Sequence, residues 1–210
     1  MQRRRRTSGF TMIEMAVTMT LFAILVAVGV PTMGTWIKNN KVRAVSDALQ
    51  TGLRAAQTES LRSSRQVVFA LTDSTTPTLY PLPAAANGLS WAIYTLPSMV
   101  GETPTFIQSG VLSNASANVQ INSNAVAAVC FNSMGRLVNN GTSVTAVTGA
   151  GTNCIQPSTP AVPGGPPVQV FAISTPGADR PLQVNLGLGG QVHMCEPTVA
   201  LSVTHPEGCQ

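Results

Sequence analysis

A long apolar run close to the N-terminus constrains this chain more than any other feature. From Phe10 to Val30 the sequence contains a single charged side chain, Glu14, and four consecutive arginines, Arg3 to Arg6, precede the run. An apolar stretch of about 20 residues is long enough to cross a bilayer as an α-helix. Its place behind a positive cluster indicates an export or anchoring signal.

Two interpretations of this signal differ in where the chain is cut. An ordinary secretory signal peptide would be removed near Ala27-Val28-Gly29, where the residues are small. Glu14 argues against it, because an ionisable side chain inside an apolar segment costs a few kcal/mol on insertion. The other interpretation places the cut between Gly9 and Phe10, so that the apolar helix stays on the mature protein.

The stretch Gly9-Phe10-Thr11-Met12-Ile13-Glu14, behind its basic leader, resembles the processing motif of type IV pilins and type II secretion pseudopilins. The resemblance implies that a membrane-embedded prepilin peptidase cleaves after Gly9 and N-methylates Phe10. It also implies that Glu14 pairs with the N-terminal amine of a neighbouring subunit during assembly. A carboxylate in hydrocarbon needs such a partner. The alternative role for Glu14 is that of a solvated residue near the membrane interface.

The apolar run is expected to continue into an amphipathic helix that ends near Ser63. Gly29 and Pro31 are the expected weak point, since proline removes a backbone donor, and many pilins carry a helix-loosening proline at the position of Pro31. Two helices joined by a loop at Gly34 are the alternative. Apolar residues recur at spacings of three and four, which predicts a buried stripe: Val42, Val45, Leu49, Leu53 and Ala56.

Charge supports an exported protein with one membrane span. The chain has 12 Lys and Arg against 8 Asp and Glu, a formal net charge of +4. Arg3 to Arg6 account for the whole excess. Positive residues stay on the cytoplasmic side of the inner membrane, so the N-terminus is expected in the cytoplasm and the chain after the helix in the periplasm. The expected divisions are a leader over 1–9, a transmembrane and filament helix over 10–31, an amphipathic helix over 32–64 and a β-rich head over 65–210.

Beyond Ser64 the pattern changes to short segments rich in β-branched and aromatic residues. The clearest hairpin has alternating arms, Leu182–Leu186 and Gln191–Met194, around a glycine-rich turn. These segments predict an α+β protein of the pilin fold, with a long N-terminal helix packed on an antiparallel sheet. Trp91 and Tyr94 are expected in the core or sheet. The expected strands are Val67–Leu71, Trp91–Leu96, Thr105–Gln108, Ala127–Phe131, Val168–Ile173, Leu182–Leu186 and Gln191–Cys195.

Four cysteines, Cys130, Cys154, Cys195 and Cys209, lie in the second half of the chain. An even number in an exported domain indicates disulfides, and three pairings are open. The sequential pairing, Cys130 with Cys154 and Cys195 with Cys209, is favoured because each bond closes one local loop. No cofactor or metal is expected. A zinc site of His193, Cys195, His205 and Cys209 is the weaker alternative, because Pro206 and Gly208 disfavour helical presentation of the last pair.

The head resembles one branch of the pilin family, the FimT, FimU and type II secretion H-type minor subunits. The resemblance rests on Cys130–Leu137 and Gly189–Pro197, with a last cysteine near the C-terminus. It implies a minor subunit of a pilus priming or tip complex. The implied partners are other minor and major pilins or pseudopilins, the prepilin peptidase and the inner-membrane assembly platform. An H-type pseudopilin of type II secretion is the alternative.

Catalysis and DNA binding are not expected. The chain has two histidines and no nucleophile or phosphate-loop motif. A FimT-like pilin that binds DNA during natural transformation is the second alternative that the resemblance offers, and in those relatives the basic residues lie in the C-terminal region. Here Gly187 to Gln210 contains no Lys or Arg and contains Glu196 and Glu207. Six of the eight basic residues after the leader belong instead to the helix segment: Lys38, Lys41, Arg43, Arg54, Arg62 and Arg65.

Overall fold

The computed structural model describes residues 9–74, 76, 78, 81–99, 101–112, 118–140, 147, 154, 156–158, 160 and 165–209, without the side chains of 28 and 30–32. Arg3 to Arg6, on which the expected topology rests, lie outside these residues. The chain forms two compact units, Met1–Ile37 and Lys38–Gln210.

The helix α1 runs from Met12 to Ser63 without a break. It begins two residues later than the sequence indicated, because Thr11 caps it. Gly34 lies inside the helix, so the alternative of two helices joined by a loop there is wrong. Ser64 follows with a φ of 52°, the left-handed conformation that commonly ends helices. Within the part of the chain described, no helix is both long enough and apolar enough to cross a membrane.

Two five-stranded sheets form the head, where the sequence had predicted one. The first has the order β3-β2-β1-β5-β6 and the second β10-β9-β8-β7-β4; every pair is antiparallel except β10 with β9. The strands are β1 Val67–Thr72, β2 Ser90–Thr95, β3 Thr105–Val111, β4 Gln120–Asn122, β5 Ala128–Phe131, β6 Leu137–Val138, β7 Val168–Ser174, β8 Leu182–Gly187, β9 Val192–Ala200 and β10 Gly208–Cys209.

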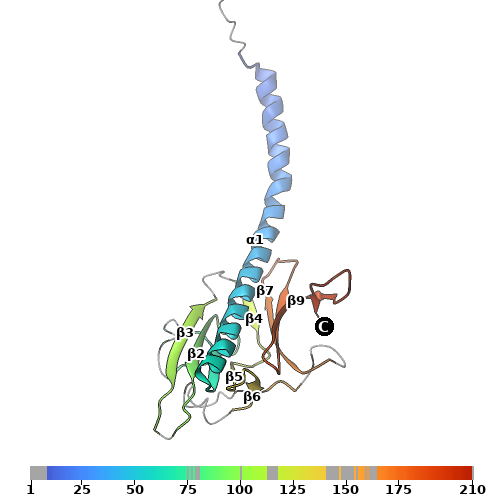
Figure 1. Cartoon of the computed structure of the whole chain (residues 1–210). Coiled ribbons are helices and arrows are strands. Elements are labelled where there is room, and N and C mark those ends of the chain that lie inside the picture. Colours follow the sequence, from blue (N-terminus) through green and yellow to red (C-terminus); the bar gives the residue numbers. More distant parts are fainter. Residues whose placement is uncertain are drawn as a thin grey trace, which may run out of the picture. The chain divides into compact units, whose positions relative to one another are not determined.

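The later part of α1 packs between the two sheets, with β2 and β3 on one side of it and β7 and β9 on the other (Figure 1). The predicted stripe from Val42 to Ala56 is buried in full, each side chain at most 1% exposed. The inward side chains of the predicted hairpin join the same core: Leu182, Val184, Leu186, Val192 and Met194. The amphipathic pattern of the helix and the alternation in the hairpin therefore predicted correctly which side chains point into the core.

The indole ring of Trp91 lies at the contact between α1 and the first sheet. Trp91 on β2 is 5% exposed and stacks on Phe69 of β1, with ring centroids 5.6 Å apart. A Cβ at Gly52 of α1 would lie 2.9 Å from the ring of Trp91, and one at Gly110 of β3 would lie 2.6 Å from it. Glycine at both positions lets the two backbones close on the ring. Trp91 and Tyr94 are core residues, as predicted.

The turn of the β8–β9 hairpin reaches the other sheet. The N–H of Leu137, at the start of β6, donates to the carbonyl of Leu188 at 3.0 Å. Gly190 in this turn has a φ of 86°, and a Cβ there would collide with the carbonyl oxygen of Gly135. That same oxygen accepts from Gln57 of α1 at 3.0 Å. One glycine turn thus ties the helix to both sheets.

Candidate functional site

The N-terminal motif is arranged around a helix cap. The hydroxyl oxygen of Thr11 accepts the backbone N–H of Glu14 at 3.3 Å, and the carbonyl of Thr11 accepts that of Met15. Threonine as the N-cap with glutamate three residues later is the spacing of a capping box, and a carboxylate is favoured near the positive end of the helix dipole. Gly9 and Phe10 therefore lie outside the helix, exposed, directly before its first turn.

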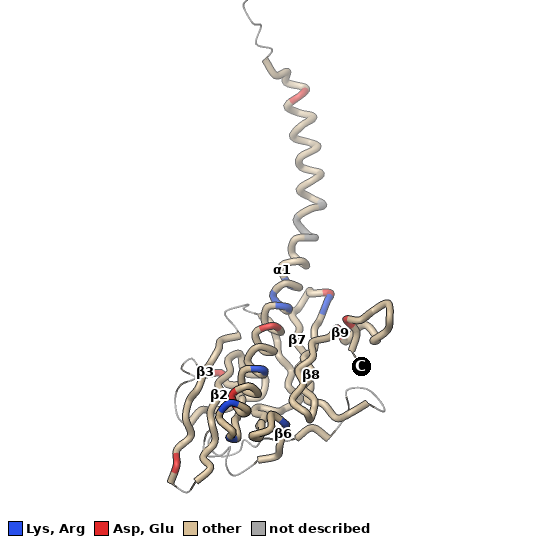
Figure 2. The backbone as a smooth tube through the Cα atoms, in the orientation of Figure 1, with Lys and Arg blue, Asp and Glu red and all other residues tan. Residues whose placement is uncertain are grey.

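The first turns of α1 expose apolar side chains in every direction. Met12 is 94% exposed, Phe22 68% and Leu25 71%, and Glu14 is exposed among them. In Figure 2 this part of the helix is almost wholly tan, whereas blue and red positions appear along its later part. An apolar surface of this kind marks an interaction with lipid or with another protein. Gly29 lies in the same helix, and so does Pro31, whose side chain is outside the described part.

Both disulfides follow the sequential pairing that the sequence favoured. Cys130 of β5 joins Cys154 with their Cα atoms 5.5 Å apart, and Cys195 of β9 joins Cys209 of β10 with theirs 5.0 Å apart. The second bond holds the C-terminal strand beside β9. It also leaves neither sulfur of the alternative zinc set as a thiolate.

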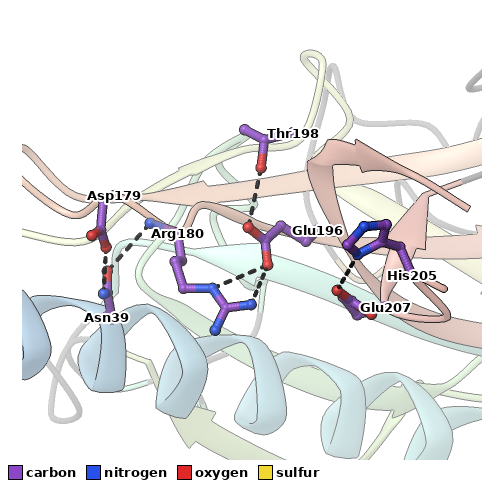
Figure 3. A network of polar contacts seen from close by, with 7 residues as sticks. All are labelled: Asn39, Asp179, Arg180, Glu196, Thr198, His205 and Glu207. Carbon is purple, nitrogen blue, oxygen red and sulfur yellow. Dashed lines mark hydrogen bonds and ion pairs between the residues drawn. The ribbon is translucent and has the colours of Figure 1, made fainter.

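A polar network links the helix to the C-terminal corner of the second sheet (Figure 3). The guanidinium of Arg180 donates twice to Glu196 of β9, at 2.8 and 3.2 Å, although Glu196 is only 7% exposed. This carboxylate also accepts from the hydroxyl of Thr198 at 3.1 Å. Beside Arg180, Asp179 accepts from the side chain of Asn39 on α1. A buried carboxylate is satisfied here by charge and hydrogen bonds together.

The pKa values of Arg180 and Glu207 in this corner are both shifted in the direction that favours the charged form. The hydrogen bond to Glu196 raises the pKa of Arg180. Glu207 has its pKa lowered, first by its own backbone N–H and then by the hydrogen bond with His205, which lies 3.2 Å away. The backbone N–H of Glu196 donates to the carbonyl of Glu207 at 2.8 Å. These contacts bind the corner together and leave it anionic rather than basic.

A second ion pair closes the loop after β2. Arg65, just beyond α1, pairs with Glu102. Glu102 also accepts the backbone N–H groups of Ser98 at 2.9 Å and Met99 at 3.3 Å. These donors, Arg65 first and Ser98 next, lower the pKa of Glu102 from 4.5 to about 2. Sequence reasoning had missed this pair and that of Arg180, because neither has a local spacing signal.

Comparison with known proteins places the chain in a family. The model of the prokaryotic N-terminal methylation motif matches residues 4–30, and that of the type II transport protein GspH matches residues 45–160. The chain belongs to the GspH family. It is thus one of the type IV pilins and pseudopilins, which are structural subunits rather than enzymes.

Solved structures of this kind resemble the chain at low identity. The type IV minor pilin FimU of Pseudomonas aeruginosa strain PAO1 gives a TM-score of 0.47 with 15% identity, over 77% of this chain and 96% of that one. A second crystal form of FimU gives 0.43 with 15% identity, over 74% and 96%. E. coli GspH gives 0.42 with 9% identity, over 76% and 91%. A comparison with curated proteins finds no match.

Proposed function

We propose that this GspH-family chain is a minor type IV pilin, a structural subunit of the priming or tip complex of a pilus. One observation supports this proposal more strongly than the others. An apolar, outwardly exposed helix begins at a capped turn that presents Glu14 four residues after Phe10. The same helix supplies the buried stripe of the head from Val42 to Ala56. One continuous element thus serves both assembly and folding.

In this proposal the prepilin peptidase cuts between Gly9 and Phe10 and methylates the new amine of Phe10. The exposed, non-helical position of both residues suits access by a peptidase. After the cut, Glu14 pairs with the Phe10 amine of a neighbouring subunit. Pairing compensates two opposite charges, either of which would be costly alone on an apolar surface.

The membrane-anchored stage before assembly is part of the same proposal. The apolar sequence from Phe10 to Val30 would hold the subunit in the inner membrane, with Arg3 to Arg6 in the cytoplasm and the head in the periplasm. The two disulfides suit an oxidising compartment. The assembly platform would then draw the subunit into the filament, and Gly29 and Pro31 would let the helix loosen there.

An H-type minor pseudopilin of type II secretion is the second candidate, favoured by the GspH match over residues 45–160. The C-terminal cysteine pair, which resembles that of the FimT and FimU subunits, favours the pilus. Deleting the gene and scoring surface piliation, twitching and exoprotein secretion in one strain separates the two. We expect loss of pili and twitching with normal secretion. Loss of secretion with normal pili would contradict the first candidate.

A further inference from the structure

A pocket beside β7 in the head is lined by polar side chains that come from separate segments of the chain: Asn124, Gln156, Ser158, Gln169 and Gln183. Its volume is about 380 Å³. Small-molecule sites in proteins usually measure roughly 300–1,000 Å³, so the pocket suits a small ligand. Among the described residues that line it, none carries a charge.

The three glutamines of this pocket have unpaired side-chain oxygens. Each uses its amide N–H groups on the protein: Gln156 donates to the carbonyl of Leu137 at 3.4 Å, Gln169 to those of Ser123 at 2.9 Å and Val170 at 3.1 Å, and Gln183 to Oδ1 of Asn185 at 2.7 Å. Within the described part of the chain, nothing donates to Oε1 of any of the three. An amide oxygen can accept two hydrogen bonds, so the pocket is rich in free acceptors.

Gln169 is the clearest sign that a ligand belongs here. It is only 5% exposed, and the two bonds from its Nε2 fix the orientation of its amide. No buried side-chain oxygen of the described residues lacks a hydrogen-bond partner, so the unpaired Oε1 of Gln169 reaches solvent. Because Gln169 lines the pocket, this oxygen is open to whatever fills it. A largely buried glutamine with a free acceptor needs such a donor.

Contacts on both sides of Gln169 fix the walls of the pocket. Ser123, whose carbonyl accepts from Gln169, begins a turn that carries Asn124 and is closed by the N–H of Val126 at 3.1 Å. The opposite wall, which includes Gln156, directly follows the disulfide between Cys154 and Cys130 of β5. The polar groups are thus held in place before a ligand arrives, which lowers the entropic cost of binding.

We infer that this pocket binds a neutral sugar residue. The hydroxyl groups of the sugar donate to the three glutamine oxygens, and Asn124 and Ser158 supply donors in return. The C–H groups of the sugar ring pack on the apolar part of the lining, which consists of Val126, Pro157, Pro160, Val168 and Val170.

Two other classes of ligand fit this lining less well. An ion would lose water without meeting a counter-charge among the described lining residues, which is unfavourable. An extended peptide presents as many carbonyl acceptors as N–H donors, so many of its carbonyls would face glutamine oxygens. Each hydroxyl of a sugar brings a donor of its own. The inference depends neither on the membrane anchor nor on filament assembly.

Saturation-transfer NMR on the full chain tests the inference. The detergent is zwitterionic, because a maltoside detergent would itself present a sugar. The neutral probes are maltose, lactose and diacetylchitobiose; glucuronic acid, glucosamine and blocked trialanine represent the charged and peptide classes. We expect at least one neutral disaccharide to bind with a Kd of roughly 1 mM, and the other two classes to bind at least about tenfold more weakly.

Methionine variants show whether the sugar occupies this pocket. Gln156→Met and Gln183→Met each remove one acceptor at nearly constant side-chain volume. We expect either change to raise the Kd about tenfold, the upper end of the effect of one hydrogen bond. Gln108→Met is the matched control, since Gln108 is exposed on β3 of the other sheet and should leave the Kd unchanged. Circular dichroism checks that each variant is folded.

Three results would overturn the inference. The first is no binding of any neutral disaccharide at about 10 mM, well above the expected Kd. The second is an unchanged Kd in both pocket variants, because the sugar would then bind elsewhere. The third is tighter binding of a charged sugar or of the peptide, which would identify a different class of ligand. None of these results bears on cleavage after Gly9, so this inference and the proposed pilin function fail separately.

Discussion

Ser64, the residue directly after α1, has a strained backbone conformation. Ser64 takes a left-handed conformation with a φ of 52°, and it is exposed. A non-glycine residue in that conformation costs about 1–2 kcal/mol, because its Cβ approaches the following carbonyl. Helices usually place glycine at this position.

Replacing Ser64 by glycine should therefore stabilise the head by roughly 1 kcal/mol, reduced by the extra entropy of glycine in the unfolded chain. Denaturant unfolding followed by tryptophan fluorescence measures the change. Ser64→Val is the paired variant and should lower the free energy of unfolding, since a β-branched residue is worse there. A glycine variant less stable than the parent would show that the Ser64 side chain makes a contribution of its own.

Glu102 makes the stability of the head depend on pH in acid. Its pKa is lowered from 4.5 to about 2 in the folded chain, so the unfolded state binds its proton more readily. The stabilising effect is present in full above pH 4.5 and is lost as the pH falls toward 2. The difference in unfolding free energy between the parent and Glu102→Gln should shrink over that range. Arg65→Gln should show a weaker dependence on pH, and a difference that stays constant from pH 5 to 2 would contradict this account.

Elements pack in this head through positions that only glycine fits. Gly52 lies in the middle of α1, where alanine would normally be the better helix former by about 1 kcal/mol. The ring of Trp91 occupies the space that its Cβ would need, at 2.9 Å. The contact between helix and sheet thus outweighs the local preference of the helix.

Gly52→Ala should accordingly destabilise the head by about 1–3 kcal/mol, the usual cost of overpacking a core. Gly34→Ala is the matched control, because it lies in the same helix and a Cβ there meets nothing within 4 Å. We expect thermal unfolding of the head to shift down for the first variant only. Equal midpoints for the two would mean that the ring of Trp91 moves aside without cost.

For the molecule as a whole, the buried faces of helix and strands could be predicted where apolar residues recur at a regular spacing. The buried stripe from Val42 to Ala56 and the β8–β9 hairpin could be identified because apolar residues recur at helix or strand spacing. The N-cap Thr11 with Glu14 three residues later also had a readable spacing, which the sequence-based prediction did not use.

The division into two sheets was not predictable in the same way. The strands β4, β6 and β10 have only three, two and two residues, too few to show an alternation. The partner of Glu196 lies 16 residues away and that of Glu102 lies 37 away, so no local pattern indicates either ion pair.

The central claim is that the apolar helix remains on the mature protein after a cut between Gly9 and Phe10. Intact-mass measurement and N-terminal sequencing of the protein, expressed together with a prepilin peptidase, test it directly. The account predicts a chain that starts at Phe10 and carries one added methyl group on its amine. A mature chain that starts at Val30 would contradict the account, because it would have lost Glu14 and the whole apolar run.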